Sequence, residues 1–284
     1  MTTATLFTRR LIRIDGADAQ SFLQGIVTTD IDGLAEGEAR PGALLTPQGK
    51  ILFDFIIWRA DGGFLVECDQ ALSEAFLRRL TMYRLRAAVT ITQEEASVSV
   101  TWGEAADSAA GVTDMAFAKA GLLLKRAPIA LVEAADAESE AAYDALRIEA
   151  GLAQSAKDYA LQDAFPHDIL LDLDGGLSFR KGCYVGQEVV SRMQHRGTAR
   201  RRLVKVTATT DLPATGTELF AGGKPLGTLG TVVGGQGLAI VRTDRVGDAL
   251  SSDLPILAGD VAVDLALPAW TGLSFPTGAA EADA

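Results

Sequence analysis

Hydrophobic positions in the first hundred residues alternate between the two-residue spacing of strands and the wider spacing of helices. A strand is predicted over residues 9–14, followed by a helix over residues 17–26 with Phe22, Leu23 and Ile26 on one face. Strands with few helices predict an α+β layer. The other predicted elements are strands at 43–45, 50–58, 64–68, 88–92 and 97–102, and a helix at 72–85.

The second half of the chain contains two regions with different residue patterns. A stretch rich in Gly, Ala and Asp at 104–111 predicts a domain boundary, and a short strand at 122–124 and a helix at 139–150 follow it. After Gly197, short strands alternate with glycine turns, which is typical of a small β-barrel or sandwich. These strands are predicted at 203–208, 218–220, 225–233 and 237–241, and residues 274–284 are predicted to be a disordered tail.

The composition is that of a folded protein of two or three domains. The chain has 284 residues, of which 48% are hydrophobic and 22% charged. Its two cysteines, Cys68 and Cys183, lie far apart, which favours a reducing compartment over a disulfide framework. The first 13 residues do not read as a signal peptide, and no apolar run approaches the roughly 20 residues of a membrane span. We therefore predict a cytoplasmic protein without a membrane partner.

The charge is uneven along the chain. The net charge of −11 argues against general nucleic-acid binding, yet residues 180–205 hold eight basic residues against one acid, Glu188. This window predicts an anion site, with a solvated basic face as the alternative. An RNA-binding reading would use residues 196–202 and the barrel, but only Phe220 and Trp270 are obvious stacking aromatics there, so direct nucleic-acid binding is not favoured.

The segment 179–188, Phe-Arg-Lys-Gly-Cys-Tyr-Val-Gly-Gln-Glu, concentrates the reactive groups. It predicts a strand that breaks at Gly182, a turn at Gly186, and a helix from Gln187 to near Gly197. A thiol at the start of a helix with Lys181 beside it lies in positive potential, which favours the thiolate. The alternative is that Cys183 is a buried structural residue.

A resident metal site is not predicted. Zinc or an iron–sulfur cluster usually needs three or four Cys or His ligands, and the only histidines, His167 and His195, lie apart from each other and from the cysteines. Cys68 closes a strand pattern and is predicted to lie in the core.

Residues 181–188 resemble the hallmark motif of YgfZ-type folate-binding proteins. These proteins are relatives of a mitochondrial iron–sulfur assembly factor and are similar in fold to the glycine-cleavage T-protein. The resemblance extends over most of the chain through four further segments, at 16–30, 44–50, 145–152 and 165–168.

This resemblance implies an α+β, three-lobed cloverleaf architecture around a central folate pocket, with two ferredoxin-like lobes and a small C-terminal β-barrel. One lobe would combine residues 1–42 with 105–196 and carry the cysteine motif. The other lobe would span 43–104, the barrel 197–273 and the tail 274–284.

The implied function is a tetrahydrofolate-binding accessory factor for assembly or repair of 4Fe–4S clusters in client enzymes, including tRNA-modifying enzymes. Cys183 would face the cluster or a redox partner, and Lys181 would lower the pKa of its thiol. The alternative is a tetrahydrofolate-dependent aminomethyltransferase or demethylase, so whether the chain is an enzyme stays open.

The resemblance also assigns two carboxylates to folate. Glu149 would bind the pterin ring, because a carboxylate can accept two parallel N–H bonds, and Asp54 would lie near the reacting nitrogen. T-proteins have a paired Asp where this chain has Phe53, which disfavours aminomethyl transfer. The structural alternatives are a helix-end acid for Glu149 and an outward strand residue for Asp54.

The remaining polar residues of the motif have weaker assignments. Tyr184 would stack on the folate or cap the core, and Gln187 and Glu188 would bind ligand or, for Glu188, favour the helix dipole. From charge alone, Arg192 and Arg196 are predicted to bind the anionic tail of a polyglutamylated folate.

Overall fold

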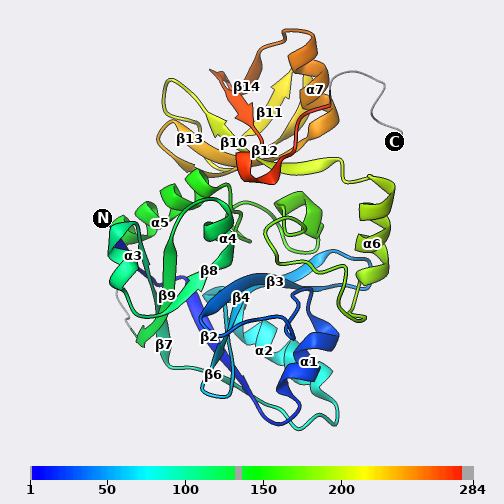
Figure 1. Ribbon diagram of the computed structural model, residues 1–284. Helices are drawn as coiled ribbons and strands as arrows, with labels where there is room; N and C mark the ends of the chain where they lie inside the picture. Colours follow the sequence, from blue (N-terminus) through cyan, green and yellow to red (C-terminus); the bar gives the residue numbers. More distant parts are fainter. Residues whose placement is uncertain (1, 132–135, 277–284) are drawn as a thin grey trace.

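The computed structural model describes residues 2–131 and 136–276. A β-barrel stands on a larger α+β body, and a helix runs along one side of their junction (Figure 1). No helix of the described residues has the length and hydrophobicity needed to cross a bilayer. The predicted α+β class with a C-terminal β-barrel is confirmed.

The first half of the body is built from residues 9–93. Its helices are α1 (Ala19–Ile26) and α2 (Gln70–Arg84), and the Asp69 carboxylate begins α2 by accepting a hydrogen bond from the Ala71 backbone N–H. Its strands are β2 (Arg9–Asp15), β3 (Glu38–Leu45), β4 (Ile51–Ala60), β5 (Gly63–Asp69) and β6 (Thr90–Gln93).

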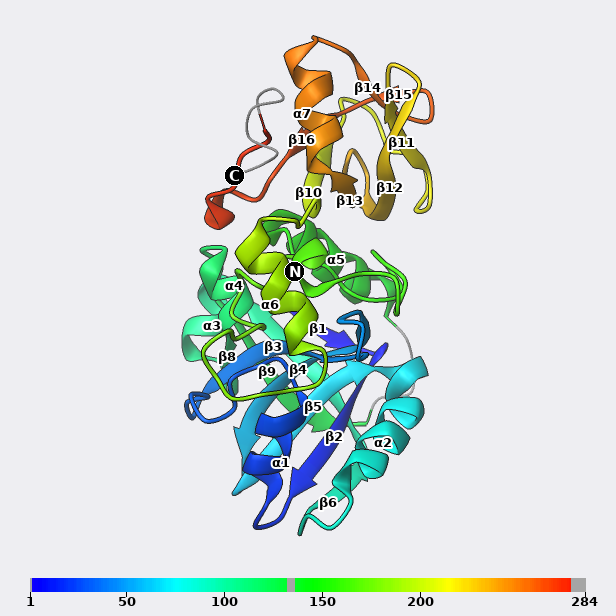
Figure 2. The same ribbon diagram turned by 90° about the vertical axis from the view of Figure 1, so that its right-hand side faces the viewer.

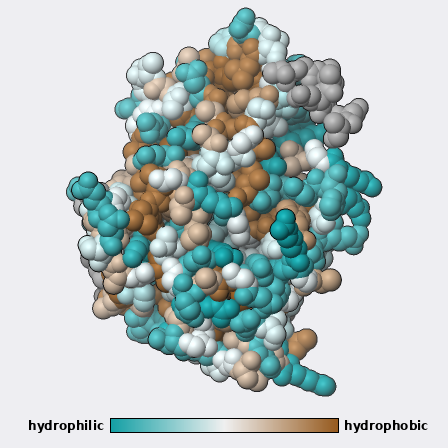
Figure 3. Space-filling view, viewed as in Figure 1, coloured by the Kyte–Doolittle hydropathy of each residue, from teal (hydrophilic) through white to brown (hydrophobic). Residues whose placement is uncertain are grey.

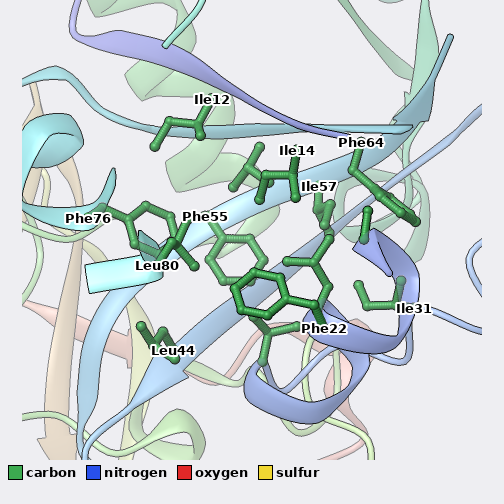
Figure 4. Packing of buried hydrophobic residues seen from close by; sticks show 14 of the residues in the cluster. Ile12, Ile14, Phe22, Ile31, Leu44, Phe55, Ile57, Phe64, Phe76 and Leu80 are labelled. Atoms are coloured by element: carbon green, nitrogen blue, oxygen red, sulfur yellow. The ribbon is translucent and has the colours of Figure 1, made fainter. Parts of the chain in front are cut away.

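Both helices of this half bury their apolar faces against the sheet. Phe22 of α1 and Phe76 of α2 enter one cluster with strand residues such as Ile12 and Phe55 (Figure 4). The Phe55 and Phe76 rings stack with centroids 5.7 Å apart. The two-residue period of β4 explains why Phe53, Phe55 and Ile57 share this face.

The second half adds strands and helices from residues 96–150, together with the first strand of the chain. Asp136 caps the longest helix of this half through two backbone N–H groups, and Gly151 ends it in the left-handed conformation. The elements are β1 (Thr3–Leu6), β7 (Ala96–Trp102), α3 (Glu104–Ser108), β8 (Val112–Asp114), α4 (Met115–Lys119), β9 (Leu124–Ala130) and α5 (Ala137–Ala150).

The two halves share one nine-stranded sheet with the order β1-β7-β9-β8-β3-β4-β5-β2-β6. β2 pairs with β5 and β6, so residues 9–15 belong with the strands of the 43–104 region. The predicted grouping of residues 1–42 with 105–196 stays a prediction: β3 pairs with β8 through Glu38 and Ala39, whereas β1 pairs with β7 and β2 with β5 and β6. Hydrogen bonding across the sheet, rather than distance in sequence, decides where the N-terminal segment lies.

A buried ion cluster, formed by side chains of the sheet itself, joins the two halves. The fully buried Arg126 of β9 donates to both carboxylate oxygens of Glu67 on β5 at 3.0 Å and to Asp114 at 2.6 Å. Arg9 of β2 donates to the same Glu67 at 2.9 Å. Two cations and two carboxylates therefore balance one another inside the protein.

The strands of the barrel lie at one end of the molecule (Figure 2) and surround an apolar core of their own. Its sheet has the order β15-β14-β11-β12-β13-β10-β16, and α7 (Thr243–Ser251), which the sequence did not predict, covers it. The strands are β10 (Arg201–Thr207), β11 (Glu218–Ala221), β12 (Lys224–Val233), β13 (Gln236–Arg242), β14 (Ile256–Ala258), β15 (Val261–Ala262) and β16 (Asp264–Ala266).

The predicted disordered tail needs a correction at its start. Phe275 packs on the barrel core, and the Pro276 backbone lies so close to Gly247 of α7 that a Cβ atom there would meet it at 2.0 Å. Burial of Phe275 therefore holds the chain onto the barrel through residue 276. Residues 277–284 of the predicted tail lie outside the described residues.

We expect Arg126→Met to lower the free energy of unfolding by about 3 to 5 kcal/mol, because it strips buried carboxylates of their cation. Urea denaturation measures this loss. Arg78→Met is the matched control, since it breaks an exposed pair with Glu74 and should cost at most about 1 kcal/mol. Equal losses in the two variants would contradict the role given to the buried cluster.

Candidate functional site

Cys183 lies on an exposed loop, not at the end of a strand. Residues 178–186 form no strand, so the predicted strand that breaks at Gly182 is wrong. The predicted helix is confirmed as α6 (Gln187–Arg196), entered through Gly186 at φ +80° and ended by Gly197 at φ +61°. Cys183 is a free, exposed thiol, which excludes the buried structural alternative.

Lys181 is anchored to the body of the protein. Its Nζ donates to the backbone carbonyls of Val27 and Thr29, each at 2.7 Å, and lies 5.3 Å from the centroid of the Tyr184 ring. Burial lowers the pKa of the Lys181 ammonium to about 8, against the opposing effect of two nearby carboxylates, Asp30 and Asp32. These contacts direct the ammonium to the carbonyls just beyond α1.

Further contacts hold the two ends of the loop. The Ser178 N–H donates to the Thr28 carbonyl at 3.0 Å, and the Thr28 hydroxyl donates to the Gly176 carbonyl at 2.7 Å. At the other end, a Cβ atom on Gly186 would meet the Thr46 carbonyl at 2.6 Å. The loop is thus set between segments 27–29 and 46–49, which the sequence resemblance had singled out separately.

Tyr184 belongs to the core. Its ring is buried in an apolar cluster with Leu45 and Val190, and its hydroxyl donates to the Ser178 carbonyl at 3.3 Å. Burial raises the pKa of this phenol. The core-capping alternative for Tyr184 therefore agrees with its position.

The outer face of α6 is hydrophilic (Figure 3). Glu188 and Arg192 are exposed and pair with each other at 2.6 Å, and Arg196 is exposed one turn further on. Gln187 is half-buried at the start of the helix.

A buried histidine contacts the C-terminal part of α6. His167, in the short 3₁₀ helix η1 (Pro166–Ile169), is fully buried, and its Nε2 lies 3.2 Å from the Gln194 side-chain oxygen. Burial lowers the pKa of its imidazole. Nothing in the sequence separated it from an exposed histidine such as His195.

Several residues of the basic window are engaged in internal contacts. Arg201 pairs with Asp163 and Asp168, Arg202 with Asp172, and Lys205 donates to the Glu149 carbonyl. Arg180, Arg196 and Arg200 are exposed and form no ion pair among the described residues.

Asp54 lines a separate cavity of about 70 Å³ between the two halves of the body and the segment 152–154. Its carboxylate accepts hydrogen bonds from the Ser155 N–H at 3.0 Å, the Ser155 hydroxyl, and the Tyr159 hydroxyl at 2.8 Å. Asp54 is therefore held rigidly, with donors already on both oxygens.

Unpartnered donors face this cavity. Arg9 Nη1 and Gln154 Nε2 are buried without a hydrogen-bond partner among the described residues, and both side chains line it. Asp174, a third lining residue, has its pKa raised to about 8 by burial, so its carboxyl is mostly protonated at neutral pH. The cavity thus offers several donors to a ligand with oxygen acceptors or to ordered water.

Sequence reasoning missed Arg9, Gln154 and Asp174. No sequence signal pointed to them, because these three positions are far apart along the chain and come together only at the cavity.

The other residues predicted to bind folate do not converge on Asp54. Glu149 is exposed on α5 and borders a different depression, which includes Trp102 and Lys205. Tyr184, Gln187, Glu188, Arg192 and Arg196 do not line the Asp54 cavity. Arg147, two residues before Glu149 and hence about 200° around the helix, lines it instead.

The polar groups of this cavity suit tetrahydrofolate, but the volume of the cavity does not. Asp54, Arg9 and Gln154 could match acceptors and donors on a pterin edge. Pockets for ligands of drug size are roughly 300–1,000 Å³, whereas this cavity measures about 70 Å³. The residues as placed therefore do not fit a whole folate.

A metal site formed by the chain itself is not found among residues 2–131 and 136–276: no group of three or more His, Cys, Asp or Glu side chains converges there. Cys68 is buried, and burial raises the pKa of its thiol to about 12. Of the two cysteines, only Cys183 is exposed to solvent.

Comparisons with known proteins place this geometry in a family. Residues 200–273 match the C-terminal β-barrel domain of CAF17. The human iron–sulfur cluster assembly factor IBA57 is 30% identical over 92% of this chain and 83% of its own length. The chain belongs to the IBA57 family of iron–sulfur cluster assembly factors. Mouse IBA57 is 29% identical over 95% of this chain and 84% of its own length.

A solved structure identifies the fold. The glycine cleavage system aminomethyltransferase T from Bartonella henselae superposes with a TM-score of 0.66 at 18% identity, covering 94% of this chain and 85% of that one. The predicted T-protein-like architecture is confirmed, and at this identity the likeness concerns the fold alone.

The family comparison corrects two predictions. The YgfZ-type resemblance pointed to a related but different branch, since the family is that of IBA57. The predicted cytoplasmic location is contradicted, because the human, mouse and Chaetomium globosum relatives are all named as mitochondrial proteins.

We expect Gly186→Ala to cost about 1 to 3 kcal/mol of stability, because an alanine at φ +80° is strained and its Cβ would meet the Thr46 carbonyl. Gly182→Ala is the matched control in the same loop, where a Cβ would meet nothing within 4 Å. Thermal unfolding of both variants measures the difference. A tolerated Gly186→Ala would show that the loop is not held against the 46–49 turn.

Proposed function

We propose that this chain is an accessory factor in iron–sulfur cluster assembly and that Cys183 is its point of contact with the cluster. One observation carries the proposal: an exposed free thiol at the tip of a loop whose two ends are fixed. The names of the IBA57 relatives support the same process.

The described residues do not bring together a full set of ligands for a 4Fe–4S cluster. A 4Fe–4S cluster takes four thiolate ligands, and no set of three or more ligating side chains converges among these residues. A partner must therefore hold the cluster. The Cys183 thiolate would replace one thiolate of that partner on one iron, the displaced thiolate would take up the proton released by Cys183, and no electron would be transferred.

The clients proposed are enzymes that need 4Fe–4S clusters, tRNA-modifying enzymes among them. An aminomethyltransferase activity has less support, because Ser155 and Tyr159 already donate to both carboxylate oxygens of Asp54 and Phe53 stands where T-proteins have a second Asp. The shared fold does not decide between the two functions.

Tetrahydrofolate is a second, separable part of the proposal. The unpartnered donors of Arg9 and Gln154 beside Asp54 support a ligand with oxygen acceptors in this cavity. A whole folate would require the lining to move apart, so folate binding would be coupled to opening of the body.

We expect Cys183→Ser to abolish the ability of the chain to restore 4Fe–4S enzyme activity in cells that lack it. Cys68→Ala is the control, because Cys68 is buried in the core and should be dispensable for this activity. Activity of a 4Fe–4S dehydratase in extracts is the readout, with protein levels checked by immunoblot. Full activity of Cys183→Ser at normal abundance would remove the basis of the proposal.

For folate, titration of the purified protein with tetrahydrofolate tests the cavity directly. Gln154→Leu removes a neutral donor and should weaken binding roughly fivefold. Glu149→Gln lies outside the cavity and should leave the affinity unchanged. The opposite ranking would place the ligand in the depression beside Glu149, and no binding by any variant would reject folate as a ligand.

A further inference from the structure

The Lys181 side chain turns away from the tip of its own loop. Two of its ammonium hydrogens are directed at the Val27 and Thr29 carbonyls, each at 2.7 Å. Val27 is the residue that ends α1, and both Val27 and Thr29 are buried. A lysine at this place satisfies carbonyls that a helix end leaves open, and its charge matches the negative end of the helix dipole.

The neighbouring contacts make this lysine one of two anchors around the thiol. Tyr184 is buried on the C-terminal side of Cys183, and Lys181 is half-buried on its N-terminal side. Between them, Gly182 and Cys183 are exposed, and apart from the residues adjacent in the chain no atom lies within 4 Å of the place where a Gly182 Cβ would be. The segment from 181 to 184 therefore presents its two central residues outward.

Other hydrogen bonds shape the approach to this anchor. The Ser178 hydroxyl oxygen accepts from the N–H groups of Arg180 and Lys181, both at 3.2 Å. Thr28, between the two carbonyls that Lys181 binds, is itself buried and bonded to Gly176 and to the Ala43 N–H. The receiving segment is thus rigid, and an anchor on it fixes the position of the loop.

We propose that Lys181 is a positioning residue, which holds Cys183 outward by clamping its loop to residues 27–29. This inference deepens the proposed function, because it says how the thiol at that site is presented to a partner. It replaces the expectation that Lys181 serves as the charge partner of the sulfur. The clamp needs two donors at the end of a long side chain, and arginine also carries several donors there.

A nitroxide spin label on Cys183 of the full-length protein tests the clamp without any cluster or partner. Cys68 is buried and should remain unlabelled, which a Cys68→Ala background confirms. Unmodified Lys181 should give a label of restricted mobility. Lys181→Met should convert the spectrum mainly to the mobile component, and Lys181→Arg should restore the restricted one.

Arg180→Met is the matched control, because it removes an exposed cation from the same loop and leaves the clamp intact; its spectrum should equal that of the parent. If Lys181→Met does not fold, Lys181→Gln serves in its place, since its side chain is neutral and shorter than that of lysine. A restricted label in Lys181→Met or Lys181→Gln, or a mobile label in Lys181→Arg, would overturn the proposal.

The outcome can be separated from that of the proposed function. Label mobility is measured on the isolated protein, so a failure of Cys183 in cluster assembly leaves the spectra interpretable. Conversely, if Cys183 is required in cells and Lys181→Met shows no gain in mobility, the cluster role stands and the positioning role falls.

Discussion

The body of this protein depends on a buried ion cluster that joins its two halves. Arg126 of β9 and Arg9 of β2 share Glu67 of β5, and Asp114 completes the charge balance. Removing ions from water is costly, so such a cluster is stable only when each charge meets an opposite one with good geometry. These side chains come from strands of both halves of the sheet, and three of them (Arg9, Asp114 and Arg126) also line the cavity beside Asp54.

The candidate thiol site follows a different principle: a short loop is fixed by its ends and left free at its tip. Lys181 and Ser178 bind the 27–29 segment, while Gly186 lies against the turn after β3. These receiving segments are far away in sequence, and the folded sheet brings them together. A fixed loop keeps an exposed thiol available while limiting the conformational entropy that a partner must remove on binding.

Membership of the IBA57 family is evidence about function, whereas similarity to an aminomethyltransferase is evidence about the fold alone. The fold supplies the body, the barrel and the cavity, but similar folds host unrelated chemistry. The cavity beside Asp54 is small and rich in unpartnered donors, whereas Cys183 stands apart on the surface. Ligand binding and cluster chemistry, if both belong to this chain, would therefore use separate places.

The sequence by itself determined most of the elements. The hydrophobic period predicted β2, β4, β5 and the main helices, Gly197 predicted the end of α6, and the spacing of turns predicted a small barrel or sandwich. It also singled out Cys183, which the structure shows to be exposed. Only the tertiary structure decided that Glu149 faces outward while Arg147 faces the cavity, that Tyr184 is core, and that Arg9 lies beside Asp54. Periodicity is a local property of the chain, whereas convergence of side chains depends on pairing between distant strands and on which helix face is buried.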